Sequence, residues 1–193
     1  MEKYLFDFIE QYMPLLEEEK KAIIDLNVFR SFKKGTVILK EGDIIKSGYL
    51  VIKGCLRCYY VIDNEEKTTA FYTENEAVTP VSDADKSRAA HFVSCVEDSI
   101  VTVGNPEMGK EMMEKFPRFE KLCMIVSEQL LVNNLATFAD FKNSTPEQRY
   151  LNLLKNRPDL LQRVPHHQIA SFLGIKPQSL SRIRKRLAQN GTV

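Results

Sequence analysis

The spacing of apolar residues along this chain changes period twice, and this limits the possible fold more than any other feature. Up to about residue 28 the apolar side chains recur with a helical period, then they alternate along short runs, and after Asn105 the helical period returns. The alternating runs are separated by turn-forming residues and fall at 36–39, 48–52, 55–62, 67–72, 91–95 and 100–103. Many short strands with close turns predict a β-sandwich or small barrel flanked by helices, which is an α+β protein.

The predicted elements divide the chain into three parts. Residues 1–116 contain the strand-rich part and its flanking helices, 117–142 form one long helix, and 143–193 form a second helical unit. At the second boundary Thr145 is placed to cap a helix, Pro146 suits its first turn, and Gln148 completes a capping box.

The long predicted helix is apolar on more than one side. Met124, Leu131 and Phe138 recur every seven residues and Leu135 follows Leu131 by four, which is the spacing of a coiled-coil stripe. Other apolar residues widen the surface beyond this stripe: Leu122, Ile125 and Val126. Each apolar side of such a helix must pack against other protein. We therefore expect a homodimer, in which the stripe packs on a second copy of the chain and the other apolar surface packs on its own domain. Burial of the whole helix inside one protomer is the alternative.

The charges are unevenly distributed along the chain. Residues 142–193 contain 10 of the 27 Lys and Arg but only 2 of the 26 Asp and Glu, a net charge of +8, whereas residues 1–141 carry −7. A short basic unit that follows a long acidic one is typical of a nucleic-acid-binding module attached to another domain. Double-stranded DNA is therefore a predicted partner.

Two short helices joined by a glycine turn are predicted inside the basic unit. Gly174 allows a left-handed turn after the first helix, Ile175 fills the corner, and Pro177 starts the second helix. The apolar residues that face each other across the pair are Ile169, Ala170 and Leu173 on the first helix and Leu180, Ile183 and Leu187 on the second. This pattern predicts a helix-turn-helix, whose second helix fits a DNA major groove.

The opposite face of the second helix carries polar and basic residues. Gln178, Ser181 and Arg182 are placed to read bases, since Arg can bind guanine and Gln adenine with two hydrogen bonds. The remaining residues are predicted to contact phosphates: Lys176, Ser179, Arg184, Lys185 and Arg186. A helical hairpin that only packs against the rest of the protein is the alternative.

This order of parts resembles the CRP/FNR family of bacterial transcription regulators, and within it the branch common in Bacteroidetes. The most specific residues lie at 146–150, 157–165, 169–175 and 179–184. The resemblance implies an N-terminal β jelly roll of the cyclic-nucleotide-binding type, a dimerisation helix, and a C-terminal helix-turn-helix domain of winged-helix type. It also implies a cytoplasmic, homodimeric, sequence-specific DNA-binding regulator, with RNA polymerase as a further partner.

The same resemblance locates the residues for DNA and effector binding. The base-reading positions fall on Pro177, Gln178 and Arg182; family members often carry Arg-Glu at the first two, so a different DNA site is implied. An effector pocket is implied around Thr79, Arg88 and Ala89.

The effector pocket departs from the pattern of cyclic-nucleotide binders. Those proteins use a Gly-Glu pair on the ribose and an Arg followed by a small residue on the cyclic phosphate. Arg88 and Ala89 keep the second element, but residues 78–81 contain no glutamate, and Pro80 lacks an amide donor. We therefore expect no cofactor and an unidentified effector. A cyclic-nucleotide-responsive regulator is one alternative, and a ligand-binding or protein-interaction module without DNA binding is another.

Other functional classes find less support in the sequence. Cys55 and Cys58 are spaced as C-x-x-C, but three residues apart on a strand they face opposite sides, so we expect buried thiols and no metal site, with a metal or redox pair as the alternative. The nucleophile-elbow, phosphate-loop and H-E-x-x-H motifs are absent, which argues against an enzyme. We expect no membrane segment and no secretory signal.

Overall fold

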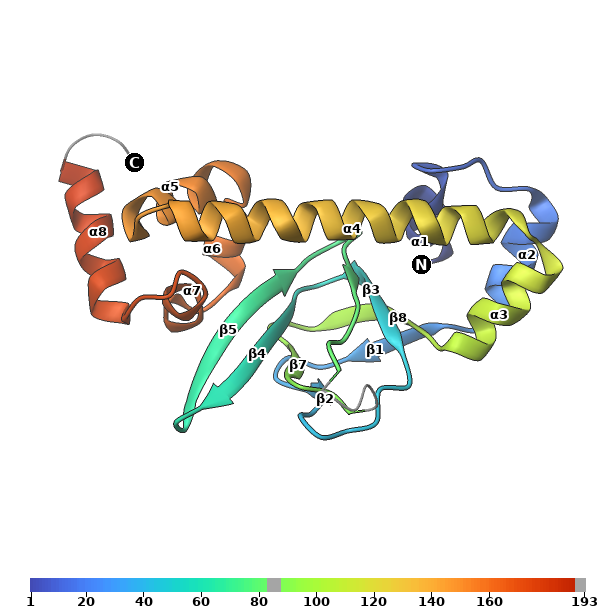
Figure 1. Ribbon diagram of the computed structural model, residues 1–193, viewed down its shortest axis with the longest axis horizontal. Helices are drawn as coiled ribbons and strands as arrows, with labels where there is room; N and C mark the ends of the chain where they lie inside the picture. The colour runs from blue at the N-terminus through green and yellow to red at the C-terminus, as the bar shows by residue number, and fades with distance from the viewer. Residues whose placement is uncertain (83–87, 190–193) are drawn as a thin grey trace.

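The structure is a computed structural model that describes residues 1–82 and 88–189. It consists of a β-sandwich, a long helix that passes across one end of the sandwich, and a small helical domain at the far end of that helix (Figure 1). The N-terminal helices lie at the opposite end of the long helix from the C-terminal domain.

The sandwich contains two four-stranded antiparallel sheets. One has the order β1-β8-β3-β6, built from Phe29–Phe32, Ser99–Gly104, Gly48–Lys53 and Ala77–Val78. The other has the order β2-β7-β4-β5, built from Val37–Leu39, Phe92–Cys95, Leu56–Ile62 and Glu65–Tyr72. Non-consecutive neighbours in both sheets give the crossed connections of a jelly roll. The six predicted runs are confirmed as strands. Strands β1 and β6 were not predicted, because both are too short to show a clear alternation of apolar residues.

Buried aliphatic side chains and two thiols fill the space between the sheets. They come from strands of both sheets and include Leu39, Val51, Leu56, Cys58, Val93, Cys95 and Val101. Buried and half-buried residues alternate along β7, whereas consecutive residues of β3 and β4 are buried, so the central strands are covered on both faces. The α+β fold class is confirmed.

A second core joins the N-terminal helices to the sandwich. It is formed by α1 (Glu2–Glu10), α2 (Glu17–Asp25), α3 (Pro106–Lys115) and the start of α4 (Arg118–Asn143). Glu19 is fully buried here: its Oε2 accepts a hydrogen bond from the Leu16 amide at 2.7 Å, and its Oε1 lies 3.3 Å from Nε of Arg118. An ion pair therefore ties α2 to the first turn of α4.

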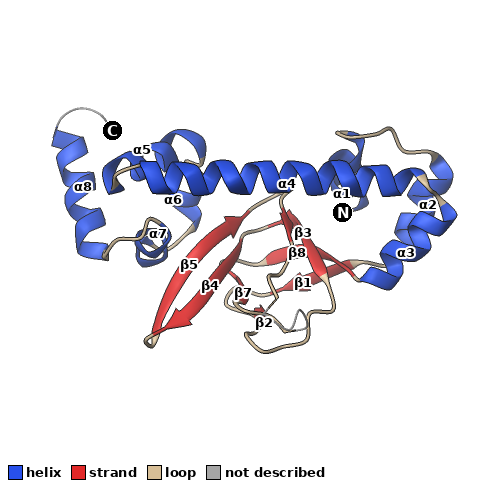
Figure 2. Ribbon diagram, viewed as in Figure 1, coloured by secondary structure: helices blue, strands red, loops and turns tan. Residues whose placement is uncertain are grey.

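The long helix α4 has one side turned to its own chain and one side exposed (Figure 2). The side toward β5 is mixed: Gln129, Asn133 and Thr137 line a cavity of about 290 Å³ together with Val126, Leu130 and strand residues. The predicted stripe lies on the exposed side, where the exposed fractions are Met124 67%, Leu131 60%, Leu135 60% and Phe138 64%. The alternative prediction, that the whole helix is buried within one protomer, is therefore wrong for these four residues.

By length and composition alone, α4 is long and apolar enough to cross a membrane. This property alone does not place α4 in a membrane, and the expectation of no membrane segment stays a prediction. Apolar residues lie on more than one side of α4, as predicted: Val126 and Leu130 line the cavity, and the stripe lies on the exposed side. The exposed side needs a cover, and the described part of this chain does not supply it.

The C-terminal domain is a bundle of four short helices: α5 (Pro146–Asn156), α6 (Leu160–Arg163), α7 (His166–Phe172) and α8 (Pro177–Gln189). The predicted capping box is present at α5, because Thr145 Oγ1 accepts from the Gln148 amide and Gln148 Oε1 accepts from the Thr145 amide at 2.8 Å. The turn of helix α6 was not predicted. The domain core consists of Tyr150, Leu153, Leu160, Ile169, Ala170, Leu173, Leu180, Ile183 and Leu187.

Candidate nucleic-acid interface

Helices α7 and α8 form the predicted helix-turn-helix. Gly174 follows α7 with a φ of +69°, in the left-handed region that favours glycine, and the Ile175 amide donates to the Ala170 carbonyl at 3.0 Å. A side chain at Gly174 would also press on the Phe141 ring, whose nearest atom would be 3.1 Å from the added Cβ. The backbone and the packing therefore both require glycine at this turn.

The predicted reading face of α8 is exposed. Gln178, Ser181 and Arg182 all have exposed side chains, while Leu180, Ile183 and Leu187 of the same helix point into the domain core. The Ser181 hydroxyl donates to the Pro177 carbonyl at 3.1 Å, one turn earlier. Helix α8 lies at the end of the molecule farthest from the N-terminal helices, so the rest of the described chain leaves it accessible (Figure 1).

The residues predicted to contact phosphates do not share one environment. Lys176 and Lys185 are exposed and Ser179 is half-buried. Arg186 is paired with Glu147 at the start of α5, and Nη1 of Arg184 lies 2.9 Å from Nε2 of His166 at the start of α7. Two of the five residues are thus held by neighbouring helices of the same domain.

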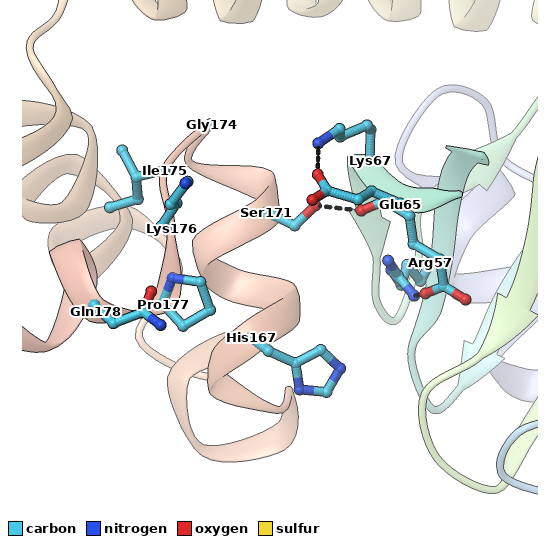
Figure 3. A pocket seen from close by; sticks show the side chains of 11 residues that line it. Arg57, Glu65, Lys67, His167, Ser171, Gly174, Ile175, Lys176, Pro177 and Gln178 are labelled. Carbon is cyan, nitrogen blue, oxygen red and sulfur yellow. Dashed lines mark hydrogen bonds and ion pairs between the residues drawn. The ribbon is translucent and has the colours of Figure 1, made fainter. Parts of the chain in front are cut away.

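The C-terminal domain packs directly on strand β5. Ser171 of α7 lies between two backbone groups of that strand, accepting from the Thr68 amide and donating to the Glu66 carbonyl, both at 2.9 Å. Figure 3 shows Ser171 directed toward the strand that carries Glu65 and Lys67. Beside this contact, the rings of Phe71 and Phe172 meet edge to face with centroids 5.4 Å apart. The residue pairs are about 100 positions apart in the chain, which is why no local pattern predicted them.

The β4–β5 hairpin and the start of α8 enclose a cleft of about 820 Å³. Arg57 on its sheet side is buried, with Nη1 2.5 Å from Glu66 Oε2 and Nε donating to Thr68 Oγ1 at 2.8 Å. Pro177 and Gln178 line the opposite side (Figure 3). The base-reading end of α8 therefore lies near the hairpin of the sandwich.

Of the three predicted effector residues, Ala89 does not present a free amide to a ligand. Thr79 and Arg88 are exposed and Ala89 is buried. The Ala89 amide donates to the Asp43 carbonyl at 2.8 Å, and Nη1 of Arg88 donates to the Gly42 carbonyl at 2.7 Å. The amide of the small residue after the arginine is thus engaged within the fold.

Three comparisons with known proteins bear on this arrangement. Residues 29–115 match the family model of the cyclic nucleotide-binding domain. The cyclic AMP receptor protein of Thermus thermophilus is 24% identical over 185 residues, which cover 93% of this chain and 85% of the relative. The transcriptional activator protein Anr of Pseudomonas aeruginosa is 22% identical over 176 residues, covering 85% and 72%. This chain is thus similar over most of its length to a cyclic AMP receptor protein and to a transcriptional activator, as the resemblance to the CRP/FNR family predicted.

The fold of this chain is also found in solved structures. FixK2 from Bradyrhizobium japonicum superposes with a TM-score of 0.67 at 16% sequence identity, covering 84% of this chain and 85% of that one. At this identity the likeness establishes the fold. The assignment to a branch common in Bacteroidetes stays a prediction.

The four cysteines of this chain are free thiols. Cys55 and Cys58 are buried on opposite sides, as predicted: Cys55 in the core shared with the C-terminal domain, and Cys58 between the two sheets. Burial raises the pKa of each thiol to about 12. Within residues 1–82 and 88–189, no group of three or more His, Cys, Asp or Glu is arranged to hold a metal ion.

Proposed function

We propose that this protein is a homodimeric, sequence-specific DNA-binding transcription regulator. The observation that carries the proposal is the exposed polar face of α8. This helix follows α7 through a turn at Gly174, and both lie in residues 142–193, which have a net charge of +8. Such a helix fits the major groove, and the charge supplies attraction to phosphates that does not depend on sequence. The proposed domains are 1–116 for sensing, 117–142 for dimerisation and 143–193 for DNA binding.

The residues of α8 take two roles in this proposal. Gln178, Ser181 and Arg182 read base edges, because they are exposed on the face opposite the domain core. The residues that set the position on the phosphates are Lys176, Ser179, Arg184, Lys185 and Arg186. Arg186 would exchange its pairing with Glu147 for a phosphate, or share the two.

The exposed stripe of α4 supports the homodimer. A second copy of α4 is the simplest cover for Met124, Leu131, Leu135 and Phe138, because pairing two identical helices buries the same stripe on both. Two α8 helices would then enter successive major grooves about 34 Å apart. On this proposal the protein acts in the cytoplasm, with RNA polymerase as a further partner, and is not an enzyme.

The sensing domain is proposed to respond to an effector that remains to be identified. The engaged Ala89 amide and the lack of a glutamate at 78–81 disfavour a cyclic nucleotide around Thr79, Arg88 and Ala89. An effector changes DNA binding only if it favours one placement of the two DNA-binding domains over another. A cyclic-nucleotide-responsive regulator is the second candidate, because the family model of residues 29–115 is that of cyclic nucleotide binding.

Selection from a random pool of DNA duplexes by the purified protein, without added ligand, tests the proposal. We expect enrichment of a two-fold symmetric site, and its loss with the Arg182→Ala, Gln178→Ala double variant. Enrichment that requires a cyclic nucleotide would favour the second candidate. Failure to enrich any sequence, with and without cyclic nucleotides, would contradict DNA binding and favour a protein-interaction module.

A further inference from the structure

Two arginines of the C-terminal domain are bound by carboxylates of the sandwich. Arg157 follows α5 and Arg163 ends α6, and their partners lie in two loops of the sandwich. We call this set, Arg157, Arg163, Glu74, Glu76 and Glu97, the interdomain ion-pair cluster. It connects parts of the chain separated by 66 to 89 positions.

Arg163 makes the densest contacts of the cluster. Its Nη1 and Nη2 both lie 2.9 Å from Glu74, one on each carboxylate oxygen, and its Nε lies 3.0 Å from Glu97 Oε1. Nη2 also donates to the Gly54 carbonyl at 2.8 Å. A planar guanidinium can satisfy these directions at once, whereas a lysine ammonium cannot reproduce the bidentate geometry.

Arg157 repeats this arrangement a short distance along the same sandwich edge. Its Nη1 and Nη2 lie 3.1 and 3.0 Å from the two oxygens of Glu76, and Nη2 donates to Thr73 Oγ1 at 2.9 Å. Glu76 in turn accepts from the Thr73 amide at 2.6 Å. Both arginines therefore bind carboxylates whose own loop is fixed by hydrogen bonds.

The cluster borders an apolar contact between the two domains. Cys55, Phe71 and Val96 of the sandwich belong to the same core as Leu160 and Val164 of the C-terminal domain. Cys55 and Leu160 are 0% and 1% exposed. Because the C-terminal domain belongs to the same core as Cys55, the thiol becomes accessible only when the two domains separate.

We propose that Arg157 and Arg163 are positioning residues, which fix α8 relative to the dimer helix α4 so that both recognition helices of a dimer meet one DNA site. This inference rests on the proposed function. Helix α8 shares the core of α5 to α7, so holding Arg157 and Arg163 on the sandwich also fixes the direction of α8. The pairs are only partly buried, with Arg163 23% and Arg157 31% exposed, so each is screened by salt and can be broken.

Alkylation of Cys55 measures the separation of the domains without any DNA. Trypsin cleaves after Lys53 and Arg57, so Cys55 and Cys58 fall in different peptides and are counted separately by mass spectrometry. We expect Arg163→Gln to raise the alkylation rate of Cys55 about fivefold, the double variant with Arg157→Gln more, and Arg163→Lys less than Arg163→Gln. Cys58 should stay unreactive in all of them, which shows that the sandwich is folded.

Lys33→Gln is the matched control. It also removes one cation that is ion-paired on the sandwich, with Asp98, but 85% of its side chain is exposed and it lies outside the cluster. Its Cys55 rate should equal that of the wild-type protein. An unchanged Cys55 rate in the Arg157→Gln, Arg163→Gln double variant would overturn the positioning role.

Binding to DNA tests the consequence for α8. With a duplex that contains two half-sites, Arg163→Gln should bind about tenfold more weakly than wild type. Once the first α8 of the dimer is bound, the second α8 is no longer held in position for the second half-site. With a duplex that contains one half-site its affinity should be unchanged. Equal losses on both duplexes, or tighter binding to the two-half-site duplex, would overturn the positioning role. Absence of DNA binding by the wild-type protein would instead overturn the proposed function, and the Cys55 rates would still report whether the arginines hold the domains together.

Discussion

The α carbon of Ser99 lies 2.7 Å from the point where a side chain on Gly54 would place its Cβ. Gly54 forms the turn between β3 and β4 with a φ of +106°. Its amide donates to Glu74 Oε1 and its carbonyl accepts from Arg163 Nη2, both at 2.8 Å. One glycine thus joins the β3–β4 turn, the start of β8 and the C-terminal domain.

Gly54→Ala should therefore be strongly destabilising. The added methyl group would overlap the Ser99 backbone, and the left-handed φ is unfavourable for alanine, so we expect a loss of about 2–4 kcal/mol in the free energy of unfolding. Urea unfolding followed by circular dichroism measures it. The control is Gly109→Ala in helix α3, where no atom lies within 4 Å of the added Cβ and a gain of about 0.5–1 kcal/mol is expected. A cost below about 1 kcal/mol at Gly54 would contradict the close approach of the Ser99 backbone.

Leu131→Glu should dissociate the proposed dimer. A carboxylate in the centre of the paired stripe would be desolvated in both copies, which weakens association by roughly 3 kcal/mol or more. Sedimentation velocity at several protein concentrations gives the dissociation constant. Ala136→Glu adds the same charge to an exposed position about 140° around the helix from Leu131 and should leave the dimer intact. A dimer that tolerates Leu131→Glu would show that another surface forms the interface.

Arg182→Ala and Lys176→Ala should weaken DNA binding in different ways. Loss of Arg182 should cost about 1–3 kcal/mol on the selected site and relax the preference at one base pair. Loss of Lys176 should weaken binding to all sequences alike and reduce the salt dependence by about one phosphate contact. Titration of each variant against the selected site and its single-base variants at several salt concentrations separates the two effects. Equal losses on every duplex for both variants would refute the division of roles.

Acid should remove the stabilisation that comes from Glu74. Burial opposes ionisation of this carboxyl, but hydrogen bonds from Arg163 and the Gly54 amide outweigh it and hold the pKa of Glu74 below its ordinary value of 4.5. Because the folded-state pKa is the lower one, the contribution is present above pH 4.5 and is lost as the pH falls through the folded-state value. We expect Glu74→Gln to cost about 0.5–1 kcal/mol near pH 7, a figure that allows for solvent screening of this part-exposed pair.

The pH dependence separates this effect from a general loss of packing. The difference in unfolding free energy between wild type and Glu74→Gln, measured by urea unfolding, should shrink as the pH falls below 4.5. Glu114→Gln removes an exposed carboxylate paired with Lys110 on α3 and should change stability little at any pH. A difference at Glu74 that stays constant with pH would mean that its charge does not stabilise the fold.

Local patterns in the sequence were sufficient to predict every described helix except α6, most strands and the polar face of α8. The alternation at 48–52 and 55–62 predicted β3 and β4 because side chains two apart on a strand share a face. The capping box of Thr145 and Gln148 predicted the start of α5, because the donors and acceptors of this motif lie within one helical turn. The two-residue strand β6 is too short to show a period, and its pairing with β3 comes from residues far away in the chain.

The sequence by itself determined that this chain has a strand-rich domain, a long helix that is apolar on more than one side and a basic helix-turn-helix, because each is encoded by neighbouring residues through period, capping and charge. Only the tertiary structure decided which side of α4 is exposed, that the Ala89 amide is already bonded, and that Arg163 holds the C-terminal domain on the sandwich. These contacts join residues dozens of positions apart. Their geometry depends on the packing of whole domains, which no local pattern of residues specifies.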